Sequence, residues 1–193
     1  DLADLSDHLL RRIPAIRSAT ITMNVGKGAM TVAVVERYGF AQVRLPQMGG
    51  MLEVDREGML YPAAGSRGTL PEIAGIGGPM LVPGRNLHEH PSGAGLMRIL
   101  GSMPAEFPRP LKSIRVVRPD HFELVFAGNV VVKADPANFP HKTDHLKTIF
   151  AKIAAPAESN KVVSYIDIRF QRDVIAYTEE ESSSSKRGSK KGR

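Results

Sequence analysis

Two groups of residues in this sequence have side chains and spacings that a metal-dependent enzyme could use. They are His88 with His90, and His141 with Asp144 and His145. On a helix the second group would place two imidazoles and a carboxylate within one turn, a spacing that suits metal ligands. The zinc-protease pattern requires glutamate directly after its first histidine, but Lys142 stands there and its charge would oppose a cation. We therefore interpret these residues as solvated histidines at a helix N-terminus and predict no metal site.

Other catalytic signatures are missing from the sequence. The glycine-rich piece at residues 75–78 does not lie between a strand and a helix, and neither the P-loop pattern nor the G-x-S-x-G pattern occurs. The chain has no cysteine, and its one run of consecutive serines, residues 182–185, lies in the C-terminal tail. Asp167 stands within a strand pattern, where a structural carboxylate paired with Arg169 or with a backbone donor is expected. By elimination we predict a binding scaffold with no catalytic residue, no cofactor and no small-molecule substrate.

The charge of the chain is concentrated at its C-terminal end. Residues 179–193 hold five basic and three acidic residues, so +4 of the formal +6 belongs to residues 1–178. Residues 179–193 are rich in serine, lysine and arginine, which predicts a disordered tail. The rest of the chain has no basic stripe interleaved with aromatic residues, and tryptophan is absent. We therefore predict no nucleic-acid partner.

The elements that would position these residues begin with a helix and a hairpin. Apolar residues recur every three or four positions in residues 1–13, with acidic residues early and basic residues late, and Pro14 follows. This pattern predicts an amphipathic helix. Residues 19–24 and 30–36 are β-rich and flank Gly26-Lys27-Gly28, which predicts a hairpin. The chain contains no run of about 20 apolar residues. It does not begin with Met, and Asp1 already lies in the helical pattern, so we expect that an N-terminal part precedes Asp1.

From Tyr38 onward the sequence is almost wholly β in character. A hairpin is predicted at residues 51–61, where Gly58 would take a left-handed conformation after a type I turn. Residues 62–91 are predicted to be mostly loop, with a short extended piece at 70–73. The remaining predicted elements are a helix capped by Ser92 that ends before Pro104, strands at 113–118, 122–126 and 130–133, a helix at 141–154, and two strands within 161–178. The predicted fold class is α+β, with a mainly antiparallel β-domain and two short helices on its sheet.

Short motifs spread along this chain resemble those of a known family. They occur in order at Ile13–Ala19, Val34–Arg37, Leu52–Leu60, Leu70–Gly75, Phe122–Val131 and Tyr165–Arg169. Together they resemble the extracytoplasmic part of the bacterial cell-division protein family FtsQ/DivIB, over nearly all of residues 10–178. The Tyr38-Gly39-Phe40 step departs from the family, which usually has a proline there.

The resemblance implies a domain organisation, a location and partners. Residues 1–40 would be the C-terminal part of a POTRA-like domain, residues 41–178 the FtsQ-type β-domain, and residues 179–193 the tail. The whole protein would cross the cell inner membrane once, through a helix upstream of Asp1, with this region on the periplasmic side at the septum. It would be a non-enzymatic divisome scaffold for cell division and septation. It would link early and late division proteins by binding the FtsB/FtsL coiled-coil pair along its last strand.

The expected docking site is the hairpin at residues 161–178, whose last strand would have one side unpaired. Its predicted partner-binding residues are Arg169, Phe170, Arg172, Val174, Ile175, Ala176, Tyr177 and Thr178. Among them, Phe170, Ile175 and Tyr177 are the expected anchors, and the two arginines suit an acidic segment. Two alternatives are a histidine-dependent metal-binding enzyme of the envelope and a basic nucleic-acid-binding module.

Overall fold

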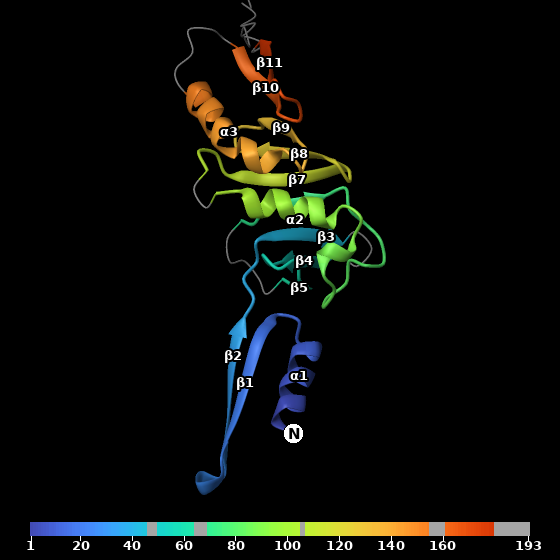
Figure 1. Cartoon of the computed structure of the whole chain (residues 1–193), viewed down its shortest axis with the longest axis vertical. Coiled ribbons are helices and arrows are strands. Elements are labelled where there is room, and N and C mark those ends of the chain that lie inside the picture. Colours follow the sequence, from blue (N-terminus) through green and yellow to red (C-terminus); the bar gives the residue numbers. More distant parts are fainter. Residues whose placement is uncertain (46–49, 64–68, 105–106, 155–160, 180–193) are drawn as a thin grey trace, which may run out of the picture.

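The computed structural model describes residues 1–45, 50–63, 69–104, 107–154 and 161–179. These residues form a helix–hairpin unit, from α1 to β2, and a sheet domain, from β3 to β11 (Figure 1). The molecule is elongated, with the tip of the hairpin at one end and β11 at the other. None of the helices in the described part of the chain combines the length and the apolar character needed to span a bilayer.

The helix–hairpin unit follows the sequence prediction closely. Helix α1 (Leu2–Arg12) starts at Asp1, whose carboxylate accepts the Ala3 N–H at 2.8 Å. Strands β1 (Ile16–Asn24) and β2 (Ala29–Glu36) pair antiparallel. They are joined by the 3-10 turn η1 (Val25–Lys27) and by a glycine whose φ is +57°. A positive φ has little steric cost for glycine, which lacks a Cβ.

The sheet domain holds one nine-stranded mixed sheet. Its strands are β3 (Ala41–Leu45), β4 (Gly50–Val54), β5 (Leu60–Pro62), β6 (Glu72–Ala74), β7 (Leu111–Arg118), β8 (His121–Phe126), β9 (Val131–Ala134), β10 (Lys161–Asp167) and β11 (Val174–Glu179). Their order in space is β11-β10-β9-β8-β7-β6-β3-β4-β5. Three neighbouring pairs are parallel, β3/β6, β6/β7 and β9/β10, and the others are antiparallel. The predicted α+β class with a mainly antiparallel sheet is confirmed.

Strand β6 joins the two halves of this sheet, although the sequence indicates only a short extended piece within a loop. It contributes three residues, and it lies parallel to both β3 and β7. Its central side chain, Ile73, is buried. Three residues are too few to show an alternating pattern, so its place in the sheet depends on partners that are distant in the chain.

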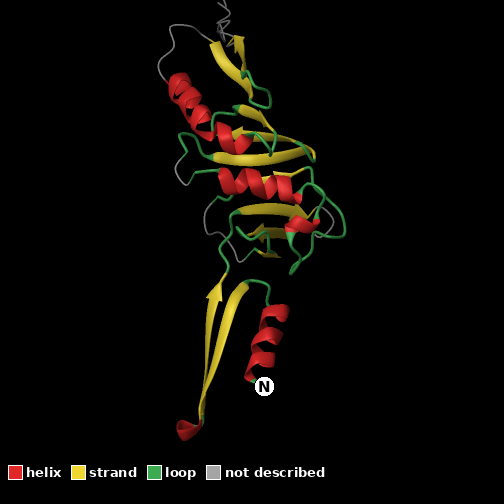
Figure 2. Ribbon diagram, in the orientation of Figure 1, coloured by secondary structure: helices red, strands yellow, loops and turns green. Residues whose placement is uncertain are grey.

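Two helices cover one face of the sheet (Figure 2), as predicted. They are α2 (Gly93–Ser102), preceded by the 3-10 turn η2 (Leu87–Glu89), and α3 (Phe139–Ala154). Ser92 occupies the N-cap position of α2, but its hydroxyl makes no capping hydrogen bond. Helix α3 begins two residues earlier than predicted, with Pro140 in its first turn, where a missing N–H removes no helical hydrogen bond.

The core lies between these helices and the sheet. Phe126 stacks on Phe107 with ring centroids 5.3 Å apart and meets Phe150 edge-on at 4.9 Å. Leu146 and Ile149, on the predicted apolar face of α3, are buried. The apolar pattern of α3 therefore identified the face of the helix that packs on the sheet.

The predicted turns that depend on glycine are confirmed. Gly58 has a φ of +84° and donates its N–H to the Asp55 carbonyl at 3.1 Å. Gly128 and Asn129, between β8 and β9, have φ values of +81° and +58°. Two consecutive positive φ values are typical of a type I′ turn, whose twist matches that of the hairpin strands.

The final hairpin differs from the prediction at both ends. Its first strand, β10, ends at Asp167 instead of continuing to Phe170, and residues 168–173 form the turn. Its second strand, β11, includes Glu179, which was assigned to the tail. The rest of the predicted tail, residues 180–193, lies outside the described residues.

Candidate docking edge

Strand β11 is at one end of the nine-stranded sheet. It pairs antiparallel with β10, and within the described residues no strand pairs with its other side. An unpaired side of a strand presents a row of backbone N–H and C=O groups that another extended segment can bind.

The opposite end of the sheet is different because the chain covers it. Strand β5 donates the Leu60 N–H to the Arg85 carbonyl at 2.9 Å and accepts the Gly84 N–H at 2.8 Å. Met59 and Asn86 form a further β-bridge beside it. The edge at β5 is thus bonded to the protein's own loop, and within the described residues β11 is the edge of the nine-stranded sheet that is open to strand addition.

The predicted docking residues divide between the two faces of β11 and the preceding turn. Val174, Tyr177 and Phe170 are 48%, 55% and 58% exposed. Ile175 and Ala176 are half-buried, and Ile175 pairs with Ile166 of β10. Because side chains alternate along a strand, Ile175 and Tyr177 lie on one face, and Val174 and Ala176 lie on the other. Two of the three expected anchors therefore share a face.

That face borders a groove between α3 and the final hairpin, with a volume of about 870 Å³. Its lining comes from both elements: Lys142, His145, Ile149, Lys152, Ile153, Val163, Gln171, Arg172, Asp173, Ile175 and Tyr177. The hairpin residues were predicted as docking residues in part, but those from α3 were not. A signal existed in the sequence, since Lys142, His145, Ile149 and Lys152 follow one another at helical spacings of three and four.

The N-terminal half of α3 is fixed to the turn before β11 through one aspartate. Lys142 Nζ lies 2.6 Å from Asp173 Oδ1, and His145 Nδ1 lies 2.7 Å from Asp173 Oδ2. Lys142 also donates to the Phe170 carbonyl. Asp173 is 8% exposed and Lys142 is 18% exposed. The ammonium group of Lys142 therefore lies against the turn before β11 and is largely shielded from solvent.

Arg169 is also bound within the protein. Its Nε and Nη2 atoms lie 2.9 and 2.6 Å from the two oxygens of Asp167, and its own backbone N–H donates to that carboxylate at 3.2 Å. Its guanidinium lies over the Phe170 ring at 5.2 Å. Hydrogen bonding to Arg169 lowers the pKa of Asp167, against the opposing effect of burial. The predicted structural role of Asp167 is confirmed, and Arg172 is the exposed arginine of this turn.

The histidine groups do not assemble into a metal site. His145 contacts Asp173, whereas Asp144 points to Lys147, with 3.0 Å between Oδ1 and Nζ. His90 Nδ1 accepts a backbone N–H of the next turn at 3.1 Å. Across the described part of the chain, no three histidine, aspartate or glutamate side chains lie close enough together to hold a metal ion.

These features define an α+β protein whose nine-stranded sheet has, among the described residues, one covered and one open edge. No protein-family model and no curated protein matches the chain. Among solved structures, it is similar to the major extracytoplasmic domain of the cell division protein DivIB from Geobacillus stearothermophilus, in its trans isomer. The two share 16% sequence identity with a TM-score of 0.40, and the match covers 64% of this chain and 99% of the other.

Proposed function

We propose that this chain is the extracytoplasmic part of a non-enzymatic bacterial cell-division scaffold, which binds its partner by strand addition to β11. Two observations support the proposal. The ordered motifs of the sequence resemble the FtsQ/DivIB family, and among the described residues β11 is unpaired on one side while the chain covers the opposite edge at β5. The second observation carries the mechanism, because strand addition requires an unpaired edge.

The backbone ladder alone would not hold a partner. Strand addition along β11 would form about five hydrogen bonds, each worth roughly 1 kcal/mol net. Association costs an estimated 4–15 kcal/mol in lost freedom and ordering. Full burial of a large apolar side chain contributes about 1.5–3 kcal/mol. Because Tyr177 and Phe170 are each more than half exposed, they have the most surface left to bury, and Ile175 has less.

The groove beside α3 supplies a second contact for the same partner. Its lining includes the buried or half-buried Ile149, Ile153 and Ile175 and the exposed Lys152 and Arg172. Asp173, the acidic residue in the lining, already accepts from two side chains of α3. This arrangement suits a segment with apolar residues and an acidic group that follows or precedes the added strand.

The partner and the location that we propose follow from the family resemblance. The partner is an FtsB/FtsL-like coiled-coil pair, and the scaffold links early with late division proteins. The whole protein would be held in the inner membrane by a single helix upstream of Asp1, so that this region lies in the periplasm at the septum.

The test compares the same substitution on an edge strand and on an interior strand. Val174→Asp on β11 and Val117→Asp on β7 change two valines of similar exposure, 48% and 44%. Binding of the purified coiled-coil pair should weaken by about tenfold or more for Val174→Asp, equivalent to about 1.4 kcal/mol, and stay unchanged for Val117→Asp.

Tyr177→Asp should abolish binding while leaving thermal unfolding nearly unchanged. Equal loss of binding in Val174→Asp and Val117→Asp, or loss of folding in step with loss of binding, would contradict docking at β11. Because Val174→Asp and Val117→Asp each add one negative charge, comparing them distinguishes an effect at β11 from a general effect of added negative charge on binding.

A further inference from the structure

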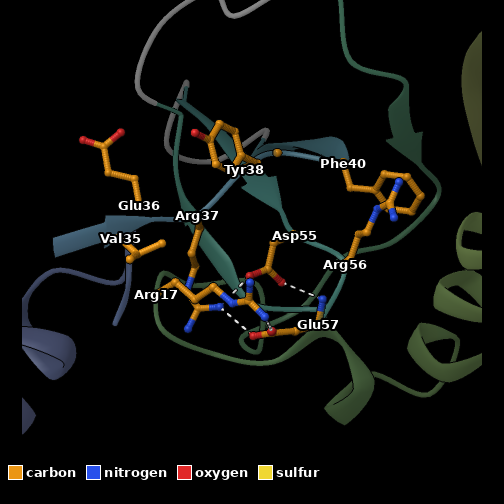
Figure 3. Close-up of a pocket in the computed structure, with 10 residues that line it drawn as sticks. Arg17, Val35, Glu36, Arg37, Tyr38, Phe40, Asp55, Arg56 and Glu57 are labelled. Carbon is orange, nitrogen blue, oxygen red and sulfur yellow. Dashed lines mark hydrogen bonds and ion pairs between the residues drawn. The ribbon is translucent and has the colours of Figure 1, made fainter. Parts of the chain in front are cut away.

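The helix–hairpin unit meets the sheet domain at residues 37–40 and at the turn between β4 and β5. Figure 3 shows Arg17 and Arg37 extending toward Asp55 and Glu57, which stand on that turn. The side chains of Arg37 and Asp55 are 12% and 8% exposed, so this pair is largely shielded from water. Burial of an ion pair has a desolvation cost, but it makes the loss of one partner more damaging than at the surface, because the remaining charge is left shielded and unpaired.

Arg37 connects three segments of the chain. Its Nη1 atom lies 2.5 Å from Asp55 Oδ2 and 3.1 Å from Glu57 Oε2, and its Nε donates to the Pro14 carbonyl at 3.1 Å. Its backbone N–H donates to the Ala15 carbonyl at 2.8 Å. Arg37, which follows the end of β2, therefore bonds both to the α1–β1 connection and to the β4–β5 turn.

Asp55 is built into the turn before it meets Arg37. Its Oδ1 atom accepts the backbone N–H groups of Glu57 and Met59, each at 2.9 Å, which leaves Oδ2 to face the junction. Glu57 adds an exposed ion pair with Arg17. Hydrogen bonds from Arg17 and Arg37 lower the pKa of Glu57. The turn thus presents two carboxylates in fixed positions.

The residues that connect the two units, 37–40, are tightly packed. A Cβ on Gly39 would lie 2.4 Å from Glu53 Oε2 and 2.6 Å from Leu70 Cδ1, so the backbone lies directly against the sheet domain. Glu53 is held in place by the Tyr61 hydroxyl at 3.0 Å. Phe40 donates its N–H to the Val54 carbonyl at 2.8 Å. A connection packed in this way differs from the flexible linker that usually separates two units.

We propose that Arg37 and Asp55 form an orientation clamp, which holds the helix–hairpin unit at a fixed angle to the sheet domain. The clamp sets the separation between the hairpin tip and β11, which lie at opposite ends of the molecule (Figure 1). The inference does not depend on the proposed function, because it concerns contacts within the chain. As a consequence of the clamp, the hairpin tip and β11 cannot move independently of each other.

The chain has no cysteine, which allows two labels to be placed at will. Met23→Cys near the hairpin tip and Lys112→Cys on β7 introduce labels at exposed positions of the two units. Pulsed electron paramagnetic resonance then measures the distribution of distances between spin labels. The clamp predicts a single narrow distribution for this pair, and a distribution about twofold broader once Arg37→Gln is added.

The matched control is Arg44→Gln, which breaks the exposed ion pair with Glu72 inside the sheet domain and should leave the distribution narrow. Asp55→Asn is the second test, because it retains Oδ1 as the acceptor for the turn while removing the charge that holds Arg37. Circular dichroism establishes that each variant is folded. A narrow distribution in folded Arg37→Gln overturns the clamp. Should that variant not fold, a narrow distribution in Asp55→Asn overturns it, and a broad one supports it.

Discussion

Replacing Asp167 by asparagine removes one charge from the turn that leads to β11 while keeping the shape of the side chain. In the native protein both carboxylate oxygens accept from Arg169, at 2.9 and 2.6 Å, and one also accepts a backbone N–H at 3.2 Å. Asparagine has one acceptor oxygen, so one of the two guanidinium contacts is lost and the other becomes a bond to a neutral group.

The magnitude follows from the kind of bond that is lost. A hydrogen bond to a charged group contributes roughly 1.5–3 kcal/mol and one between neutral groups about 1 kcal/mol. The side chains of Arg169 and Asp167 are 24% and 9% exposed, so water replaces only part of the lost bonding. We expect the free energy of unfolding to fall by about 2 kcal/mol at pH 7, which for a chain of this length lowers the melting temperature by about 4–8 °C.

The effect should depend on pH with a definite sign. Hydrogen bonds from Arg169 are the largest influence on the pKa of Asp167 and lower it. A group whose folded pKa is depressed stabilises the protein above its unfolded pKa, about 3.9 for aspartate, and this stabilisation is lost as the pH falls through the folded pKa. The difference between native protein and Asp167→Asn should therefore shrink as the pH falls below about 4.

Urea unfolding followed by circular dichroism at pH values from 7 to 3 tests this prediction. Asp144→Asn is the matched control, because it makes the same chemical change in a pair with Lys147 whose aspartate is 91% exposed. It should change the free energy of unfolding by less than about 0.5 kcal/mol. The reasoning is refuted if the two variants behave alike at pH 7, or if the effect of Asp167→Asn is the same at every pH.

Two further predictions concern the core and α2, both measured by chemical denaturation. Phe126→Ala removes a fully buried ring that contacts two other phenylalanines and should cost about 3–5 kcal/mol; a loss below 1 kcal/mol would contradict that packing. Gly93→Ala should destabilise by more than about 2 kcal/mol, because its Cβ would lie 1.7 Å from the Leu87 carbonyl oxygen. In Gly101→Ala, in the same helix, the added Cβ would have no atom within 4 Å, so this variant should be stabilised by up to about 1 kcal/mol. Equal effects of the two glycine substitutions would contradict the close packing of Gly93.

The sequence alone determined the features that depend on near neighbours. The first helix, Gly58 as a left-handed turn residue and the Gly128-Asn129 turn could all be predicted, because apolar periodicity and backbone sterics select them. The apolar face of α3 was equally readable from its period. Each of these features depends on interactions within one short segment and not on the structure around it.

The candidate site was only partly predictable, because some of its contacts join residues that are distant in the sequence. The sequence indicated β11 as the last strand and its apolar residues as anchors, since the alternation is local. It did not indicate that Lys142 and His145 would turn toward Asp173, about 30 residues along the chain. It did indicate a structural pairing of Asp167 with Arg169, but Arg169 was still placed among the docking residues, and the structure leaves Arg172 as the exposed arginine of the turn.

Tertiary structure decided the rest through contacts between distant segments. Strand β6 has three residues and no pattern of its own, and its position is set by β3 and β7 on either side. The contact between Arg37 and Asp55 brings together the end of β2 and a turn on the far side of β3, 18 residues later. In each case the energy comes from a partner that the local sequence does not specify, so only the assembled sheet domain fixes the edge, the groove and the clamp.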